Sequence, residues 1–367
     1  MKEIGIGIVG GGYMGKAHSV AMASVGAIFG TTLRPRLEMI ATTSVESSRR
    51  YQHSYGFNRS TSDWRELVDD EHVEAIIIAS PQETHKEIAE RAFSAGKHVL
   101  CEKPMGVSLD EAQSMVASAE AAALKGIANM VAYNYIRTPA SQFARQLISN
   151  GEIGELTWFR GEHTEDFDAN PDNEATWRNF GDANGCLGDL APHPINAMLA
   201  LIGPISELNA DVEIVHKQRG GVDVSNDDQL QVMCRFKNGV MGHLFASRTA
   251  TGRKMGYTYE ITGTKGAIRF DQEDQNALWL YRSEGPESEL GFKKILTGPA
   301  HPDYVNFCLG AGHGTGYQDQ ITIEARDFLL AIETGKPVWP TFRDGLKVAE
   351  VVAAIRKSNA SRSWVNV

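Results

Sequence analysis

The fold of this chain is decided by Ile4-Gly5-Ile6-Gly7-Ile8-Val9-Gly10-Gly11-Gly12-Tyr13-Met14-Gly15. The apolar residues up to Val9 predict a short buried strand, and the residues from Tyr13 onward predict a helix. Between them, Gly10 permits a tight turn, Gly12 lets a phosphate approach the backbone, and Gly15 lets the helix pack on the strand. The helix N-terminus then offers N–H groups to an anion. The stretch predicts a phosphate-cradling strand–turn–helix unit; the alternative is a glycine-rich turn without a ligand.

Strands and helices alternate with short connections in the residues that follow. Strands are predicted at 37–42, 73–79, 98–101 and 127–133, and helices at 47–55, 63–68, 84–95 and 108–124. Alternation of this kind is typical of a doubly wound parallel sheet with helices on both faces. We place a domain boundary near residues 126–136, around the last of these strands, and divide the chain at residue 130.

Extended segments dominate the second half. After a predicted helix at 139–149, they lie at 156–162, 208–215, 229–236, 240–247, 257–262, 267–270 and 277–281. Asn238-Gly239 between two of them is a strong hairpin signal. Strands joined by hairpins form a largely antiparallel sheet, so we expect an α+β domain here. Helices at 317–333 and 342–358 follow a Gly- and Pro-rich region at 285–316 that predicts irregular structure.

Composition excludes several function classes. The 367 residues carry a net charge of −10, which argues against a nucleic-acid partner. No apolar run approaches the ~20 residues that a membrane span requires. The four cysteines form no C-x-x-C pair, and the chain enters a strand directly without signal-peptide features, so we expect a reduced, cytoplasmic protein.

The end of the second predicted strand bears on the choice of dinucleotide. An acidic residue there holds the ribose hydroxyls of NAD, but this chain has Ser44. Glu46 could substitute from the following turn, whereas Arg49 or Arg50 could assist a 2′-phosphate. The sequence favours NAD and leaves NADP open.

Lys103 follows the strand at 98–101 in the run Cys101-Glu102-Lys103-Pro104. Ligands of doubly wound sheets bind at the carboxyl ends of the strands. A lysine there can hydrogen-bond a hydroxyl and stabilise its oxygen during oxidation. We expect Pro104 to hold the backbone beside the nicotinamide, and Glu102 to pair with a ribose or with Lys103. The alternative is an ordinary surface lysine.

Asp189 and His193 are spaced i, i+4, so on a single helix they would point the same way. Pro192 suits the first turn of a helix and predicts a helix start near this point. His193 can remove a hydroxyl proton near neutral pH, and Asp189 would orient it or bind the same hydroxyl. The alternative is a capping Asp beside a packing His.

Three further groups are weaker candidates. The run His163-x-Glu165-Asp166 follows a predicted strand, and metal binding is its rival interpretation, but it lacks a recognisable ligand set, so we predict no metal. Trp177-Arg178 could bracket a sugar, with a core Trp and a solvated Arg as the alternative. Asn134-Tyr135 is expected to line the substrate cleft.

Four motifs in order resemble one known family. The glycine loop, Ala79-Ser80-Pro81…His85, Glu102-Lys103-Pro104 and Asp189-x-x-x-His193 together resemble the glucose–fructose oxidoreductase / inositol dehydrogenase (Gfo/Idh/MocA) family over essentially the whole chain. Details at 10–18, 62–65, 134–140 and 297–302 are most similar to its levoglucosan dehydrogenase-like branch. The resemblance implies an NAD(P)-binding Rossmann domain at 1–130. It also implies a substrate-binding and oligomerisation domain at 131–367, whose open mixed sheet pairs in homodimers or homotetramers.

The resemblance also implies roles for individual residues. The catalytic set is Lys103, Asp189 and His193. Besides Gly10, Gly12 and Gly15, the expected cofactor contacts are Tyr13, Met14, Ser44, Ser80, Pro81, His85, Glu102, Lys103, Trp177 and Arg178. The expected substrate contacts are Lys103, Asn134, Tyr135, Glu165, Trp177, Asp189 and His193. Ser44 departs from the acidic residue common in NAD-using members. Glu165 and Asp166 fall where members vary with substrate, so specificity for levoglucosan does not carry over.

These features together predict an NAD(P)-dependent oxidoreductase. Its substrate would be a sugar, anhydrosugar or cyclitol whose secondary ring hydroxyl, such as the C3 hydroxyl of levoglucosan or a glucoside, becomes a ketone. Two alternatives remain: a glycosidase that retains its NAD, and a non-catalytic sugar sensor. The sensor has no need of Lys103, Asp189 and His193, whose presence argues against it.

Overall fold

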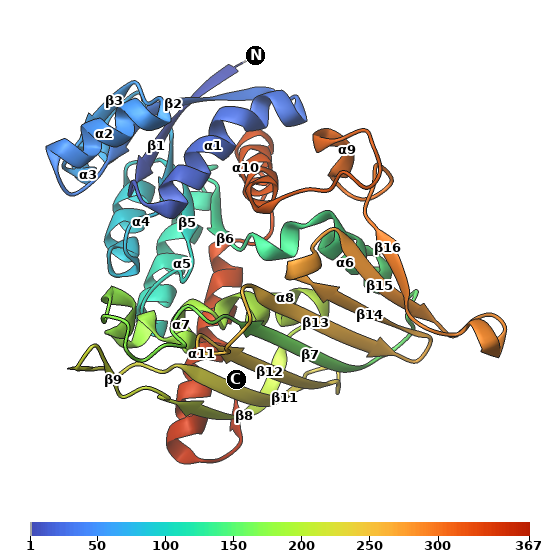
Figure 1. The fold of residues 1–367 in the computed structure, drawn as a ribbon. Coiled ribbons are helices and arrows are strands. Elements are labelled where there is room, and N and C mark those ends of the chain that lie inside the picture. The colour runs from blue at the N-terminus through green and yellow to red at the C-terminus, as the bar shows by residue number, and fades with distance from the viewer. Residues whose placement is uncertain (1) are drawn as a thin grey trace. The chain divides into compact units, whose positions relative to one another are not determined.

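The computed structural model describes residues 2–367, which form two compact units (Figure 1). The first unit contains the residues up to Arg137 together with Gly316–Lys347, and the second contains Thr138–Thr315 and Val348–Val367. The boundary predicted from the sequence, at residue 130, would place residues 316–347 in the second domain. They join the first unit because the helix α10 (Tyr317–Thr334) packs against α1 (Tyr13–Phe29).

The first unit is a doubly wound parallel sheet, as the sequence predicts. Within the described residues its strands lie in the order β3-β2-β1-β4-β5-β6, all parallel. The chain reverses direction of winding between β1 and β4, and ligands of such sheets bind at this switch point. In chain order the elements are β1 (Lys2–Val9), α1, β2 (Leu33–Ala41), α2 (Val45–Tyr55), β3 (Arg59–Thr61), α3 (Trp64–Asp69), β4 (Ala75–Ile78), α4 (His85–Ser94), β5 (His98–Glu102), α5 (Leu109–Ala123), β6 (Asn129–Ala132), α10 and the start of α11 (Phe342–Ser361).

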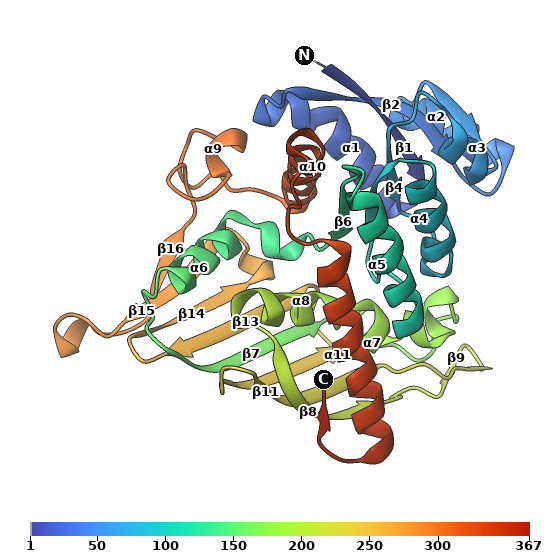
Figure 2. The ribbon, with the colours of Figure 1, turned by 180° about the vertical axis from the view of Figure 1, so that it is seen from behind.

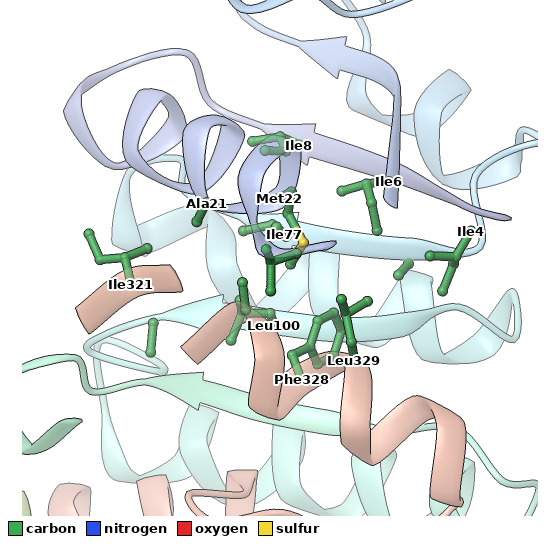
Figure 3. Packing of buried hydrophobic residues seen from close by; sticks show 14 of the residues in the cluster. Ile4, Ile6, Ile8, Ala21, Met22, Ile77, Leu100, Ile321, Phe328 and Leu329 are labelled. Atoms are coloured by element: carbon green, nitrogen blue, oxygen red, sulfur yellow. The ribbon is translucent and has the colours of Figure 1, made fainter. Parts of the chain in front are cut away.

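The core of the first unit shows why α10 belongs to it. Ile4, Ile6 and Ile8 alternate along β1 and therefore share one face of the sheet. Figure 3 shows Met22 of α1 and Phe328 of α10 in the same buried cluster. A late segment of the chain thus completes the hydrophobic core of the early βα units.

The second unit contains a mixed, largely antiparallel sheet, which confirms the predicted architecture. Its order is β16-β15-β14-β13-β7-β12-β11-β8-β17 in the described residues, and only β12 and β7 among these neighbours pair in parallel. The predicted hairpin at Asn238-Gly239 joins β11 to β12. The elements are α6 (Pro139–Ser149), β7 (Leu156–Thr164), α7 (Cys186–Asp189), α8 (Pro192–Leu201), β8 (Ile205–Glu213), β9 (Gln218–Arg219), β10 (Val222–Asp223), β11 (Gln229–Phe236), β12 (Met241–Ser247), β13 (Gly256–Gly263), β14 (Gly266–Asp271), β15 (Ala277–Arg282), β16 (Lys293–Leu296), α9 (Tyr304–Phe307), the rest of α11 and β17 (Val365–Asn366).

One face of this sheet is covered by helices. α6 and α8 contact its strands and lie on the same side of it (Figure 2). Along β11, buried residues alternate with exposed ones, among them Met233, and Met241 on β12 is exposed as well. The region predicted as irregular at 285–316 also contains the short elements β16 and α9, which have too few residues for a periodic signal. No helix in residues 2–367 is long and apolar enough to cross a membrane.

Candidate active site

The glycine loop has the geometry of a phosphate cradle. Gly10 has φ +104°, and an added Cβ would lie 2.3 Å from the Ala79 carbonyl oxygen. A Cβ on Gly15 would lie 2.0 Å from the Gly10 carbonyl oxygen, so both positions require glycine. A Cβ on Gly12 would meet nothing within 4 Å. Gly12 also begins α1 without a side-chain cap, which leaves the first-turn N–H groups for an anion. The open space at Gly12 fits the pyrophosphate of a dinucleotide.

The substitution Gly12→Ala should separate cofactor binding from folding. Because the added methyl group has free space in the protein itself, we expect it to destabilise the fold by less than about 1 kcal/mol. The same methyl group would occupy the space of the pyrophosphate, so the Kd for NAD should rise at least about tenfold. Calorimetric titration and thermal unfolding measure the two effects. The matched control is Gly291→Ala, another open glycine. An unchanged NAD affinity in Gly12→Ala would contradict this placement of the cofactor.

The predicted ribose end lies after β2. Ser44 is exposed and is the N-cap of α2, where its hydroxyl accepts a hydrogen bond from the Ser47 N–H at 3.1 Å. Glu46 is exposed in the first turn of the same helix. The Arg50 guanidinium lies 4.7 Å from the centre of the Tyr51 ring. The structure therefore places a neutral hydroxyl at this position, with an acidic and a basic side chain in the following helix.

His85 links the loops that follow β4 and β5. Its imidazole is buried and lies 3.0 Å from the Ser80 carbonyl oxygen and 2.9 Å from the Pro104 carbonyl oxygen. The Ser80 hydroxyl is hydrogen-bonded to the Thr84 hydroxyl at 2.7 Å, and Pro81 is exposed. These two loops leave neighbouring strands at the carboxyl edge of the sheet. His85 therefore fixes the backbone on which Ser80 and Pro104 lie.

Glu102 is buried at the end of β5 and makes two hydrogen bonds. Its Oε2 accepts a hydrogen bond from the Lys103 backbone N–H at 3.2 Å. Its Oε1 lies 2.8 Å from Nε2 of His18, a fully buried residue of α1 that sequence reasoning missed. The Lys103–Pro104 peptide is cis, and Lys103 itself is half-buried.

An aromatic group forms beside the glycine loop within the first unit. Tyr13 is 72% exposed and stacks on Tyr317 of α10, with ring centres 5.9 Å apart. The Tyr135 ring lies 6.1 Å from the Tyr317 ring, and the Tyr317 hydroxyl contacts the Met14 sulfur at 3.5 Å. Three predicted site residues therefore meet around Tyr317, which was not predicted.

Asn134 is held by the same late helix. Its side-chain amide donates a hydrogen bond to the Gln320 side-chain oxygen at 3.2 Å, and both residues are buried. Gln320 was not predicted either. Nothing in the local sequence indicates that α10 returns to the first unit.

The expectation that Asp189 and His193 share one helix is wrong. Asp189 ends α7, and His193 lies in the first turn of a separate helix, α8. Pro192 and Pro194 lack the N–H groups that a helix continuing from α7 would need. The predicted helix start at Pro192 is confirmed, since it occupies the first turn of α8. His193 is buried, whereas Asp189 is partly exposed.

His163 at the end of β7 brings other predicted residues together. Its Nδ1 lies 3.0 Å from the Leu190 carbonyl oxygen, and its Nε2 lies 3.0 Å from Oε1 of Glu165. Its ring centre is 5.5 Å from that of His193. Glu165 and His193 are therefore both neighbours of one buried imidazole.

Trp177 and Arg178 are exposed neighbours of Asp189. Trp177 is 59% exposed, so the alternative of a core Trp is wrong. The Arg178 guanidinium lies 4.4 Å from the centre of the indole, and its Nε is 3.8 Å from Oδ2 of Asp189. An aromatic face, a guanidinium and a carboxylate thus lie together, a combination that suits the C–H face and hydroxyls of a sugar.

A buried ion network fixes the backbone of this segment. Arg248 donates through Nη1 to the Arg178 carbonyl oxygen at 2.9 Å and through Nε to Oδ1 of Asp228 at 2.9 Å. Arg219 donates to the same Asp228 oxygen at 3.0 Å. All three charged side chains are buried, so their pairing compensates for the loss of water. Sequence reasoning missed them because they are far apart in the chain.

The acidic residues near His163 do not resemble a metal centre. Oε1 of Glu165 lies near His163, and Asp166 forms an ion pair with Lys254 at 2.7 Å. In the described part of the chain, no group of three or more His, Cys, Asp or Glu side chains is arranged to hold a metal ion.

Comparison with known families places the chain. The model for the oxidoreductase family with an NAD-binding Rossmann fold matches residues 4–129, and the GFO/IDH/MocA C-terminal domain matches residues 141–269. The chain belongs to the GFO/IDH/MocA oxidoreductase family. It is therefore an NAD-binding oxidoreductase, as the sequence predicts.

Individual relatives match over the full length. Levoglucosan dehydrogenase of Pseudarthrobacter phenanthrenivorans is 38% identical, covering 100% of this chain and 99% of its own length. Glucose-6-phosphate 3-dehydrogenase of Bacillus subtilis is 26% identical, covering 99% and 98%. The structure of a levoglucosan dehydrogenase in complex with NADH and levoglucosan matches with a TM-score of 0.96 at 37% identity, covering 100% of both chains.

Proposed function

We propose that the protein is an NAD-dependent dehydrogenase that oxidises a secondary ring hydroxyl of a sugar, anhydrosugar or cyclitol to a ketone. The observation that carries the proposal is the full-length similarity to a levoglucosan dehydrogenase, at 38% identity, in a chain that has Lys103 and His193. Levoglucosan and glucosides are the first substrates to test, with C3 as the reacting carbon.

Lys103 is proposed to stabilise the reacting oxygen. It follows β5 at the carboxyl edge of the parallel sheet, where ligands of doubly wound sheets bind. As a cation it would donate a hydrogen bond to the hydroxyl and favour the negative charge that develops on oxygen as the proton leaves. The Glu102 carboxylate, which accepts the Lys103 N–H, supports a fixed backbone at this point.

His193 is proposed as the general base for the hydroxyl proton. Its neighbour His163 is tied to the Leu190 carbonyl and to Glu165, which supports a fixed orientation of both rings. Asp189 is proposed to bind the same hydroxyl. Its carboxylate has Arg178 as a cationic neighbour, with the guanidinium Nε 3.8 Å from Oδ2.

The cofactor contacts proposed for this chain begin with the glycine loop. The N-terminus of α1 would hold the pyrophosphate, since the space at Gly12 is open. NAD bound there would supply the acceptor for the hydride of the carbon that bears the hydroxyl. The remaining proposed contacts are Tyr13, Met14, Ser44, Ser80, Pro81, His85, Glu102, Lys103, Trp177 and Arg178.

The proposed substrate contacts come from both units. Trp177 offers an exposed aromatic face to the C–H groups of a ring, and Arg178 offers donors to hydroxyls. Tyr135 belongs to the aromatic group at Tyr317 and would supply a second ring surface. Asn134 and Glu165 would hydrogen-bond further hydroxyls.

The substitution Ser44→Asp should increase the preference for NAD over NADP. Aspartate is as good an N-cap as serine, so we expect α2 to keep its start and the protein its stability. The new carboxylate would accept hydrogen bonds from the ribose of NAD and repel the 2′-phosphate of NADP. The ratio of kcat/KM for the two cofactors should rise at least about tenfold, a change of about 1.4 kcal/mol. Ser44→Asn is the uncharged control; an equal rise in Ser44→Asn would contradict the electrostatic explanation.

Reduced-cofactor absorbance tests the proposed function. Purified protein is mixed with NAD or NADP and with levoglucosan, glucose, glucosides, inositols or xylose. A steady rise in the absorbance of reduced cofactor with one of these sugars supports the dehydrogenase. Release of free sugar from a glycoside without net NADH would favour the NAD-retaining glycosidase. Sugar-dependent binding to a partner protein without turnover would favour the sensor.

The proposal includes a homodimer or homotetramer in the cytoplasm. The exposed residues of the nine-stranded sheet, which include Met233 and Met241, support pairing through that face. All four cysteines are free, which supports a reducing compartment. Sedimentation of the purified protein measures the number of subunits, and a monomer at micromolar concentration would count against the oligomer.

A further inference from the structure

His18 connects α1 to the backbone of Lys103. It is fully buried, and its Nε2 lies 2.8 Å from Oε1 of Glu102. The other carboxylate oxygen of Glu102 accepts the Lys103 N–H at 3.2 Å. A buried carboxylate requires donors on its oxygens, and a charged donor makes the stronger hydrogen bond. The buried Glu102 carboxylate is thus hydrogen-bonded to His18 through one oxygen and to the Lys103 backbone through the other.

A second buried carboxylate acts on His18 through its charge. Glu324 of α10 is fully buried, and its Oε1 lies 3.4 Å from Nε of Arg137, which also pairs with Asp327. Both carboxylate oxygens of Glu324 and Nδ1 of His18 are buried without a hydrogen-bond partner. Burial raises the pKa of Glu324 to about 7, although the charges of Arg137 and His18 lower it. His18 and Glu324 therefore belong to one coupled cluster.

The surroundings of His18 favour its charged form. Burial alone lowers the pKa of His18, but the hydrogen bond to Glu102 and the charges of Glu102 and Glu324 outweigh it, so the pKa lies above its ordinary value. For a base with a raised pKa, the stabilising interaction is present at low pH. It is lost as the pH rises through the folded-state pKa. The negative charges of Glu102 and Glu324 thus raise the pKa of the His18 imidazole, and Glu324 in turn lies beside the Arg137–Asp327 ion pair.

We propose that His18 is a positioning residue for Lys103: its imidazole holds the Glu102 carboxylate, and this carboxylate fixes the backbone that carries the lysine. The charge of the Glu324 carboxylate raises the pKa of this imidazole. The proposal rests on the proposed role of Lys103 in catalysis. His18 itself is not among the proposed substrate or cofactor contacts, so its effect should fall on turnover far more than on NAD binding, to which Glu102 is only one of the proposed contacts.

Steady-state kinetics of two His18 variants test the proposal. His18→Leu fills the space but leaves a carboxylate oxygen of Glu102 without its donor, so kcat should fall about 30-fold with less than about a threefold change in the Kd for NAD. His18→Gln supplies an amide N–H in place of Nε2–H and should restore kcat to within about fivefold of the wild type. Equal impairment of both variants, or a kcat within about twofold of the wild type in His18→Leu, would overturn it.

A matched control and a second readout keep the test independent of folding and of the proposed function. His98 lies at the start of β5, where it accepts a hydrogen bond from the Ala128 N–H at 2.9 Å, and His98→Gln should leave kcat within about twofold.

NMR of labelled histidine follows the titration of the His18 imidazole. The His18 signal is assigned because it disappears in His18→Gln.

We expect the midpoint of His18 to lie above that of an ordinary histidine, and the midpoint to fall in Glu324→Gln. A midpoint at or below that of an ordinary histidine, or no shift in Glu324→Gln, would overturn the proposal even if His18→Leu does not fold. A wild-type protein that shows this titration but turns over no sugar would instead count against the proposed function.

Discussion

Replacing Lys103 by alanine should lower kcat with the preferred sugar about 100- to 1000-fold. The lysine is proposed to stabilise charge that develops on the reacting oxygen only as the hydroxyl proton leaves. An interaction realised mainly in the transition state contributes to turnover and little to ground-state binding. The Kd for NAD should therefore rise much less than kcat falls, because the pyrophosphate cradle at Gly12 is untouched and Lys103 is only one of the proposed cofactor contacts. Stopped-flow or steady-state kinetics, together with calorimetric titration of NAD, separate the two quantities.

Lys125→Ala is the matched control for Lys103→Ala. Lys125 is exposed in the same unit after α5, and its removal should leave both kcat and NAD affinity unchanged. A Lys103→Ala enzyme with full activity would show that the proposed mechanism is wrong. A large loss of NAD affinity with unchanged kcat would assign Lys103 to cofactor binding alone.

Replacing His193 by alanine should lower kcat about 100- to 10,000-fold, because the hydroxyl proton loses its acceptor. The side chain is buried in the first turn of α8, so its removal leaves a small space lined by the ring of His163. Free imidazole added to the buffer should enter this space and restore part of the activity in a concentration-dependent manner. Rescue of this kind distinguishes a missing base from a misfolded site. Free imidazole can replace the lost proton acceptor, but it cannot restore the helix packing that a misfolded site would lack.

His243→Ala is the control for His193→Ala. His243 lies on β12 and is half-buried, and no catalytic role is proposed for it. This variant should keep its activity and show no response to imidazole. Full activity of His193→Ala without imidazole would contradict the assignment of His193 as the base.

The fold could largely be predicted because its signals are local. The strand, the glycine loop and the helix at 4–27 follow one another directly, and Asn238-Gly239 marks its hairpin within a few residues. The return of α10 to the first unit has no such signal. It depends on side chains such as Phe328, which pack on strands about 300 residues away in the sequence. Periodicity in the local sequence does not reveal a contact over such a separation.

The candidate site was predicted where a motif carries its own chemistry. Glu102-Lys103-Pro104 is an example, since ligands of a parallel sheet bind at the carboxyl ends of its strands; the catalytic role of Lys103 stays a prediction. His18 and Glu324 could not be found in this way, because each is an ordinary helix residue until α1, β5 and α10 are packed together. The expectation of a single helix around Asp189 is wrong because Pro192 and Pro194 cannot continue α7 and instead lie in the first turn of α8. The i, i+4 spacing does not reveal this interruption.

The central claim is that hydride leaves a ring carbon of the sugar while its hydroxyl becomes a ketone. The most direct test uses the sugar selected by the substrate panel, with deuterium at the reacting carbon, and analyses cofactor and product by NMR and mass spectrometry. We predict one equivalent of NADH with the deuterium at the nicotinamide, together with one equivalent of a ketone that has lost it. Reduced cofactor without deuterium, or free sugar released without any NADH, would contradict the account.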